Sequence, residues 1–345
     1  MTNYLIMTNG VKEHYFYRPY EGICMRVQNV GGIWQERVTV LENGHDGFGV
    51  YADKAGNVHL ICVNNENKLV YAVRKNGLWK KYALSKLNDD IFASDMRLYS
   101  VNGRLNLLYS ALYNGENLLI HCILGDHAKP STVDSLESPH FFLHGGRVYY
   151  TNASGNLGYV SLADEKPAEF VKIYDDAHCG SVYSLGGRDF IVFTRESKLY
   201  IDGNEVLYDS RMETPFCVKG SDRLYIMWRS GSFVRYIASF NGGATWSEPM
   251  RFMSTGADIS VYLAQQGENF AAFYGFNNTK EITLLGKPNV FEEIADYSAP
   301  AQSEIEKLRS ALNSAQSDIQ NAKQDIIRLN KAINKIKETS KQLPR

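Results

Sequence analysis

Three arginines occupy equivalent positions in a sequence motif that recurs along the chain. Arg18, Arg195 and Arg229 each follow a Gly-containing turn by a similar short distance, which places them at the ends of second strands. Guanidinium groups hold carboxylates and sulfates through paired hydrogen bonds. We therefore expect the three side chains to converge on an anion site on one face. The alternative is that each arginine forms a separate surface ion pair.

The same count of residues from the turn of each repeat places further polar and aromatic residues on that face. Tyrosine and arginine are enriched in binding hot spots, and tyrosine offers an apolar ring with a polar tip. We therefore predict that this face binds a glycan or a protein partner. The residues are Tyr17, Tyr20, His45, Asp46, Asp95, Tyr113, Asp175, His178, Arg211 and Tyr274.

The elements that must position these residues are short strands joined by Gly- and Asn-rich turns. A strand–turn–strand motif recurs seven times, for example from Val101 and from His144. Its period is about 40 residues, which is the length of a propeller blade. A single four-stranded blade cannot bury both its faces. The pattern predicts an all-β fold, a seven-bladed β-propeller of four-stranded antiparallel blades over residues 1–295. Two stacked β-sandwiches are the alternative, but they predict no fixed period. The sequence does not indicate how the ring closes.

A different pattern follows the repeats. Residues 296–302 are expected to form a linker, and Ser303 with Glu306 forms a capping box that opens a helix. Apolar residues then alternate at intervals of three and four, which predicts a coiled-coil oligomerisation helix over residues 303–343. Its charge pattern favours a parallel homo-oligomer, either a dimer or a trimer. The seam includes Ile305, Leu308, Leu312, Ile319, Ile326, Leu329, Ile333 and Ile336.

One local motif carries a family resemblance. The segment Ser239-Phe-Asn-Gly-Gly-Ala-Thr-Trp246 resembles the Asp-box, S-x-D-x-G-x-T-W, of BNR-repeat, sialidase-like propellers, with Asn241 at the Asp position. An Asx side chain caps such a turn, Gly243 allows positive φ, Thr245 ties the loop and Trp246 packs between strands. The resemblance supports the propeller. In that family the box is a structural turn on the face opposite the active site.

The chain departs from the sialidase pattern where catalysis would occur. The family's F-R-I-P motif has only a partial counterpart, Phe16-Tyr-Arg18-Pro-Tyr, and no nucleophile pair or acid can be assigned. We therefore assign no catalytic residues. We expect a non-catalytic recognition or scaffold protein whose coiled coil presents several propeller faces together. A diverged sialidase-type exo-glycosidase is the alternative.

Composition excludes several other classes. The 345 residues are 44% apolar and 22% charged, with 37 basic and 38 acidic side chains, so neither a nucleic-acid nor a membrane partner is expected. The five cysteines form no C-x-x-C pair, and we expect no metal and no cofactor. The first residues do not resemble a secretory signal, which makes the cytoplasm the expected compartment.

Overall fold

The fold is known from a computed structural model. It describes residues 2–8, 10–29, 32–125, 130–162, 168–185, 188–219, 223–252, 259–266, 269–277 and 282–285. The contacts of the chain divide it into two units, Met1–Phe291 and Glu292–Arg345, and every described residue belongs to the first. The expected linker at 296–302 and the expected coiled coil at 303–343 therefore lie outside the described residues. No described helix is long and apolar enough to cross a membrane.

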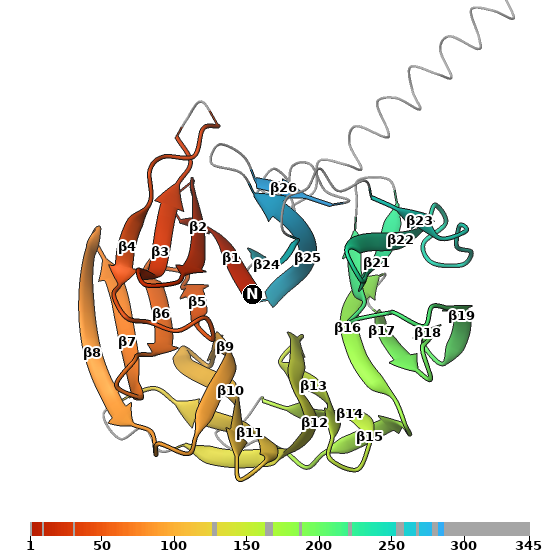
Figure 1. Ribbon diagram of the computed structural model, residues 1–345, viewed down its shortest axis with the longest axis horizontal. Coiled ribbons are helices and arrows are strands. Elements are labelled where there is room, and N and C mark those ends of the chain that lie inside the picture. Colours follow the sequence, from red (N-terminus) through yellow and green to blue (C-terminus); the bar gives the residue numbers. More distant parts are fainter. Residues whose placement is uncertain are drawn as a thin grey trace, which may run out of the picture. The chain divides into compact units, whose positions relative to one another are not determined.

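All regular elements in the described ranges are β-strands, and the fold is an all-β propeller. Five sheets surround a common centre (Figure 1). The first sheet has the order β26-β25-β24-β1-β2-β3-β4, and the second has the order β15-β14-β13-β12-β11-β10-β9. The other three sheets are β5–β8, β16–β19 and β20–β23.

The strands follow one another as short antiparallel runs. In the first part of the chain they are β1 (Thr2–Thr8), β2 (Val11–Arg18), β3 (Gly22–Val27), β4 (Val38–Leu41), β5 (Gly49–Ala52), β6 (Val58–Val63), β7 (Lys68–Lys75), β8 (Leu78–Lys86), β9 (Phe92–Val101), β10 (Arg104–Tyr113), β11 (Glu116–Ile123) and β12 (Ser131–His144). The later strands are β13 (Arg147–Asn152), β14 (Leu157–Ser161), β15 (Val171–Tyr174), β16 (His178–Leu185), β17 (Arg188–Arg195), β18 (Lys198–Ile201), β19 (Asn204–Tyr208), β20 (Phe216–Lys219), β21 (Leu224–Ser230), β22 (Phe233–Ser239), β23 (Met250–Arg251), β24 (Ser260–Gln266), β25 (Asn269–Asn277) and β26 (Ile282–Leu284).

Each of the seven repeated motifs forms two adjacent antiparallel strands, as the sequence predicts. The pairs are β1–β2, β5–β6, β9–β10, β12–β13, β16–β17, β20–β21 and β24–β25. Positive φ angles at Asn102 (51°) and Gly103 (74°) form the β9–β10 turn. Asn and Gly adopt this left-handed conformation most readily, which explains the recurring turn residues.

The expectation of seven separate four-stranded sheets is wrong in one respect, because neighbouring strand groups are joined. The start of β12 pairs with β11 and its end pairs with β13, with a register shift between Leu136 and Phe141. The intervening segment, which contains Pro139, continues as strand without a loop. In the other large sheet, β1 pairs with β24 in parallel, Leu5 lying opposite Ala264. These two junctions reduce the number of hydrogen-bonded sheets to five.

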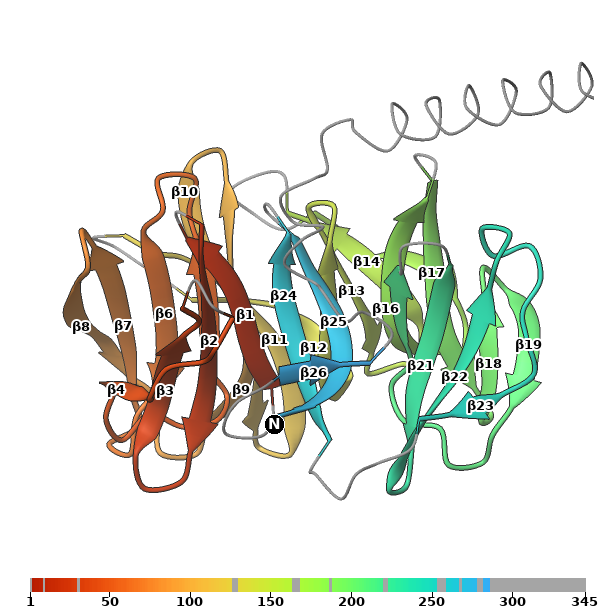
Figure 2. The ribbon, with the colours of Figure 1, turned by 90° about the horizontal axis from the view of Figure 1, so that it is seen from above.

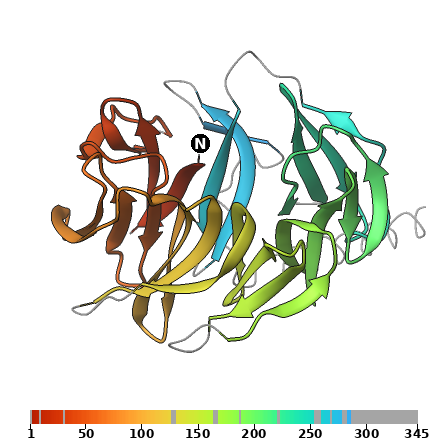
Figure 3. The same cartoon turned by 60° about the horizontal axis from the view of Figure 1, so that its bottom comes forward.

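Aromatic side chains fill the spaces within and between sheets. Tyr4, Tyr15, Tyr51, Tyr109, Tyr149, Tyr150 and Tyr262 are among the largest fully buried side chains. The strands run between the two faces of this unit (Figure 2), and β24 and β25 (blue) lie beside β1 (red) in Figure 3. The strands β1, β5, β9, β16, β20 and β24, together with the second half of β12, begin near one common face and line the centre.

Candidate functional site

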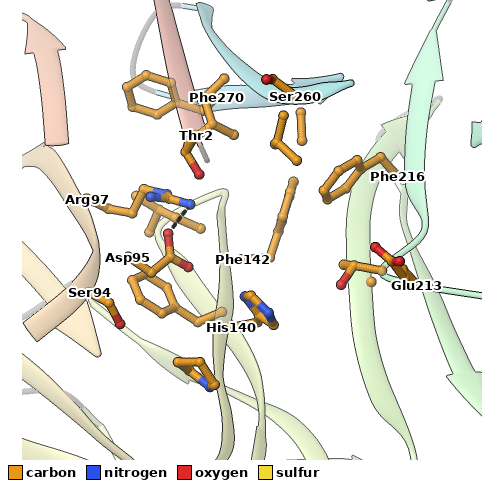
Figure 4. A pocket seen from close by; sticks show the side chains of 18 of the residues that line it. Thr2, Ser94, Asp95, Arg97, His140, Phe142, Glu213, Phe216, Ser260 and Phe270 are labelled. Atoms are coloured by element: carbon orange, nitrogen blue, oxygen red, sulfur yellow. Dashed lines mark ion pairs between the residues drawn. The ribbon is translucent and has the colours of Figure 1, made fainter. Parts of the chain in front are cut away.

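A cavity of about 460 Å³ opens at the centre of the described unit. Its wall comes from the beginnings of the innermost strands β1, β9, β16 and β24, the segments before β5 and β20, the middle of β12, and parts of β21 and β25. In Figure 4 the labelled side chains surround an open space, with Asp95 and Arg97 on one side and Glu213 and Phe216 on the other. Because these residues are far apart in sequence, only the closed ring brings them together.

The deeper wall is aromatic and apolar. Phe48, Phe141, Phe216 and Phe270 line the cavity and are each less than a tenth exposed. Tyr274 also lines it, but its hydroxyl donates to the carbonyl of Thr214 at 2.8 Å. Burial raises the pKa of the Tyr274 hydroxyl well above its usual range. These rings therefore offer apolar faces rather than reactive groups.

One side of the cavity is a buried ionic cluster. Arg97 pairs with Asp95, and the two side chains are 12% and 15% exposed. Arg97 also donates to the Tyr4 hydroxyl oxygen at 2.9 Å, and Tyr4 donates to the carbonyl of Met96 at 2.8 Å. Burial alone lowers the pKa of Arg97, but the charge of Asp95 and the contact with Tyr4 outweigh it and raise that pKa. The guanidinium is therefore charged and is held by Asp95, Tyr4 and the carbonyl of Met96.

The opposite side and the rim carry exposed polar groups. Arg229 Nε donates to the carbonyl of Gly231 at 3.0 Å and lies 3.9 Å from a carboxylate oxygen of Glu213. Asp46 and His140 are exposed and also line the cavity. The charged groups of the wall are thus three carboxylates, from Asp46, Asp95 and Glu213, and two guanidiniums.

Four residues of the face predicted from sequence line this cavity. They are Asp46, Asp95, Arg229 and Tyr274. The expected convergence of three arginines is not found, because Arg229 alone of them is a lining residue. Arg18 pairs with Glu21 at 3.3 Å, and Arg195 donates to the Asp175 carbonyl while its guanidinium lies over the Tyr200 ring. All three arginines do lie at or near the ends of β2, β17 and β21, as the position in each repeat predicts. A side chain at a strand end does not always point to the centre of the ring, however.

The other predicted face residues do not line the cavity. Tyr20 is fully exposed in a turn with a positive φ of 69°, and Tyr113 is exposed at the end of β10. His178 forms an exposed ion pair with Glu137 at 2.8 Å. The remaining residues outside the cavity lining are Tyr17, His45, Asp175 and Arg211.

Sequence reasoning missed Arg97, His140, Glu213 and the phenylalanines of the deep wall. These residues belong mainly to the starts of first strands, whereas the register argument followed the ends of second strands. Antiparallel neighbours bring those two positions to the same face. The run Ser94-Asp-Met-Arg97, polar residues on an otherwise apolar inner strand, was the available signal.

The turn between β22 and β23 forms as its sequence predicts. Thr245 N donates to Asn241 Oδ1 and Asn241 Nδ2 donates to Thr245 Oγ1, both at 2.9 Å, while Gly243 N donates to Ser239 Oγ at 2.8 Å. Gly243 has a φ of 92°. Trp246 packs, partly buried, against the cluster that contains Trp228. The motif is thus a structural turn.

Neither thiol nor metal chemistry is evident in the described ranges. Burial raises the pKa of the Cys179 thiol, which borders the cavity, to about 12. No group of three or more His, Cys, Asp or Glu side chains is placed there to hold a metal ion.

No protein-family model and no curated protein matches the chain. Similar solved structures include a mutant of the Aleuria aurantia lectin in complex with Fucα1-6GlcNAc, with 11% identity over 84% of this chain and 97% of that one and a TM-score of 0.43. The Hadza microbial sialidase Hz136 has 10% identity over 82% of this chain and 65% of that one, with a TM-score of 0.46. AofleA from Arthrobotrys oligospora has 14% identity over 83% and 86%, with a TM-score of 0.42. These likenesses concern the fold alone.

Proposed function

We propose that this chain is a non-catalytic recognition protein that binds a glycan in its central cavity. The observation that carries the proposal is the cavity itself, which combines buried aromatic rings with polar side chains. Its volume of about 460 Å³ lies in the usual range for small-molecule sites, roughly 300–1,000 Å³. A sugar ring has apolar C–H faces, on which aromatic rings pack, and hydroxyls around its edge, to which polar side chains hydrogen bond. The cavity wall provides both kinds of group.

The charge arrangement supports binding rather than sialidase-type hydrolysis. A sialidase grips the carboxylate of its substrate with arginines, but here Arg97 is paired with Asp95 and Arg229 lies beside Glu213. Arg97 would have to give up its buried acidic partner to bind an anion, and an anion at Arg229 would lie beside the carboxylate of Glu213. Three carboxyl groups in one cavity nevertheless keep exo-glycosidase activity as the second candidate, because most glycosidases act with a pair of carboxyl groups.

The proposal includes a finer architecture. We propose that each of the two large sheets joins two blade-sized groups of strands, through β12 in one case and the β1–β24 pair in the other, so that five hydrogen-bonded sheets hold seven such groups. Residues 303–343 form a parallel coiled coil that joins two or three chains. Linking several sites raises avidity by about 10²–10⁴ when the ligand spans them.

A glycan array probed with the full-length protein tests the function. We expect binding that is lost in Asp46→Asn and Glu213→Gln, two exposed cavity residues, and kept in Tyr20→Ala, which lies outside the cavity. A fluorogenic sialoside assay on the same samples tests hydrolysis. Sialoside turnover that Glu213→Gln abolishes would establish the enzyme instead, and glycan binding unaffected by both cavity variants would refute this site.

A further inference from the structure

Asp95 has an unusual backbone conformation for a residue inside a strand. Its φ is 44°, in the left-handed region, within β9. The pairing of β9 with β10 shifts register at this place, between Leu108 and Ser110. A bulge of this kind redirects a side chain, and such strained residues cluster at functional sites. The conformation costs on the order of 1–3 kcal/mol and has to be held by its surroundings.

The surroundings hold the Asp95 carboxylate in one orientation. Its Oδ1 pairs with Arg97, and Arg97 Nη1 is in turn fixed by the Tyr4 hydroxyl at 2.9 Å and the Met96 carbonyl at 3.0 Å. A carboxylate has about four acceptor positions on its two oxygens. Among the described residues, none hydrogen bonds to the second oxygen, Oδ2, and Asp95 lines the cavity.

Among the charged groups of the wall, three carboxylates stand against two guanidiniums. Asp95, Asp46 and Glu213 present carboxylate oxygens, while both guanidiniums lie beside an acid. A ligand with several hydroxyl donors and no negative charge matches this arrangement. A ligand carboxylate or sulfate would meet like charge at short range, which is unfavourable in a partly buried site.

We propose that Asp95 is the specificity-determining contact of the cavity, accepting hydrogen bonds from adjacent hydroxyls of a neutral sugar, and that the site excludes acidic sugars. Arg97 and Tyr4 are positioning residues, since they act by fixing the Asp95 carboxylate. This inference rests on the proposed glycan-binding function and names its ligand class. It replaces the anion site expected from the three arginines.

The test is a calorimetric titration of the full-length protein with one neutral and one acidic sugar chosen from the array. Asp95→Asn removes the charge and half the acceptor capacity, while Asn tolerates the positive φ. We expect at least a tenfold loss of affinity for the neutral sugar. The matched control is Asp176→Asn, at a residue that also has a positive φ, 49°, but lies outside the cavity lining. It should bind as the unmodified protein does.

Tyr4→Phe tests the positioning role. Removing the hydroxyl frees one donor of Arg97 without removing the carboxylate, so the neutral-to-acidic affinity ratio should fall severalfold, and less than in Asp95→Asn. A purely structural effect would lower both affinities together and leave that ratio unchanged, which would overturn the role of Tyr4.

Two readouts do not depend on whether a variant folds. The unmodified protein should prefer neutral to acidic sugars, and its weak binding of acidic sugars should improve with salt, because ions screen the repulsion. A preference for acidic sugars would overturn the inference while leaving glycan binding intact, as would full binding by folded Asp95→Asn. The absence of any cavity-dependent glycan binding would instead overturn the proposed function and this inference with it.

Discussion

The side chain of Gln265 in β24 hydrogen bonds to both backbone polar groups of Ala52 at the end of β5. Ala52 N donates to Gln265 Oε1 and Gln265 Nε2 donates to the Ala52 carbonyl, both at 2.7 Å. The two residues belong to different sheets, and Gln265 is 7% exposed. The amide thus supplies one donor and one acceptor, as a neighbouring strand would, at an edge of β5 with which no described strand pairs.

Replacing this amide by a carboxylate should expose its role. Gln265→Glu keeps the shape but removes the donor, which leaves the Ala52 carbonyl facing a buried acceptor. We expect a loss of about 1–3 kcal/mol in the free energy of unfolding, measured by urea denaturation at neutral pH. Gln28→Glu makes the same change at a solvent-exposed hydrogen bond, to the carbonyl of Gly32 at 2.6 Å, and should change stability little. Equal effects at the two positions would contradict this account.

A buried ion pair also joins different sheets. Glu13 of β2, 2% exposed, pairs with Arg74 of β7 and accepts from the hydroxyls of Thr8 and Tyr15, both at 2.7 Å. Breaking such a pair leaves an uncompensated buried charge, so Glu13→Gln should lower the free energy of unfolding by about 3 kcal/mol or more.

The exposed pair of Glu66 and Lys68, at 2.6 Å, is its control. Glu66→Gln should cost less than about 1 kcal/mol, because solvent screens the pair. Chemical denaturation of both variants side by side makes the comparison, and a smaller effect at Glu13 than at Glu66 would show that the buried pair is not stabilising.

Stability should fall in mild acid because of His14. This fully buried ring accepts a hydrogen bond from Arg26 Nε at its Nδ1, 3.1 Å away, and its Nε2 lies 3.2 Å from Asn3 Oδ1. Burial, and then the charge of Arg26, hold the pKa of His14 well below its usual 6.5. The folded state therefore stays neutral where the unfolded chain takes up a proton.

The stability that His14 contributes is full above about pH 6.5 and is lost as the pH falls below it, at about 1.4 kcal/mol per pH unit for one proton. Urea denaturation at a series of pH values from 7.5 down to 5 measures this slope. In His14→Gln the dependence of the free energy of unfolding on pH should be weaker by the contribution of one proton. An identical slope in both proteins would exclude His14 as the titrating group.

The turn around Asn241 should tolerate its family variant. Asn241→Asp should be nearly neutral, since the Oδ1 that accepts from Thr245 N is kept. Trp246→Ala should destabilise by about 3–5 kcal/mol through loss of a large packed ring. Thermal melting measures both, and an unchanged midpoint in Trp246→Ala would show that the ring is not a structural plug.

The oligomer prediction concerns the second unit of the chain. The full-length protein should be a dimer or trimer, whereas a chain ending at Ala299 should be a folded monomer. Light scattering gives the mass of each. A monomeric full-length protein, or a shortened chain that still assembles, would refute the coiled coil as the source of assembly.

The fold was largely accessible from sequence because its signals are local. The Gly–Asn turns and the alternating strands fix each hairpin, and all seven hairpins form. The joining of sheets was not accessible. Residues 131–144 contain no turn signal strong enough to show that two pairing partners share one strand, and no local pattern indicates the parallel β1–β24 pair.

The site could be predicted from sequence only in part. The position of a residue in its repeat assigns it to a strand end, but does not tell in which direction its side chain points. Arg18 and Arg229 occupy comparable positions in β2 and β21, yet Arg18 turns to the nearby Glu21 while Arg229 reaches the cavity. Arg229 also has an acidic neighbour, Glu213, but that residue itself lines the cavity. Asp95 was placed on the right face, but its bulge and its pairing with Arg97 depend on contacts that no single repeat contains.

The parallel pairing of β1 with β24 bears on how the chain reaches its native state. Leu5 and Ala264 lie side by side, so β1 has to wait during synthesis for a strand that is made near the end of this unit. Contacts between such distant segments slow folding, since a long loop has to close before they form. Until then the inner edge of β1 is an unpaired template for other strands. We therefore expect the growing chain to depend on protection of that edge, and ring closure to be the slow step of refolding.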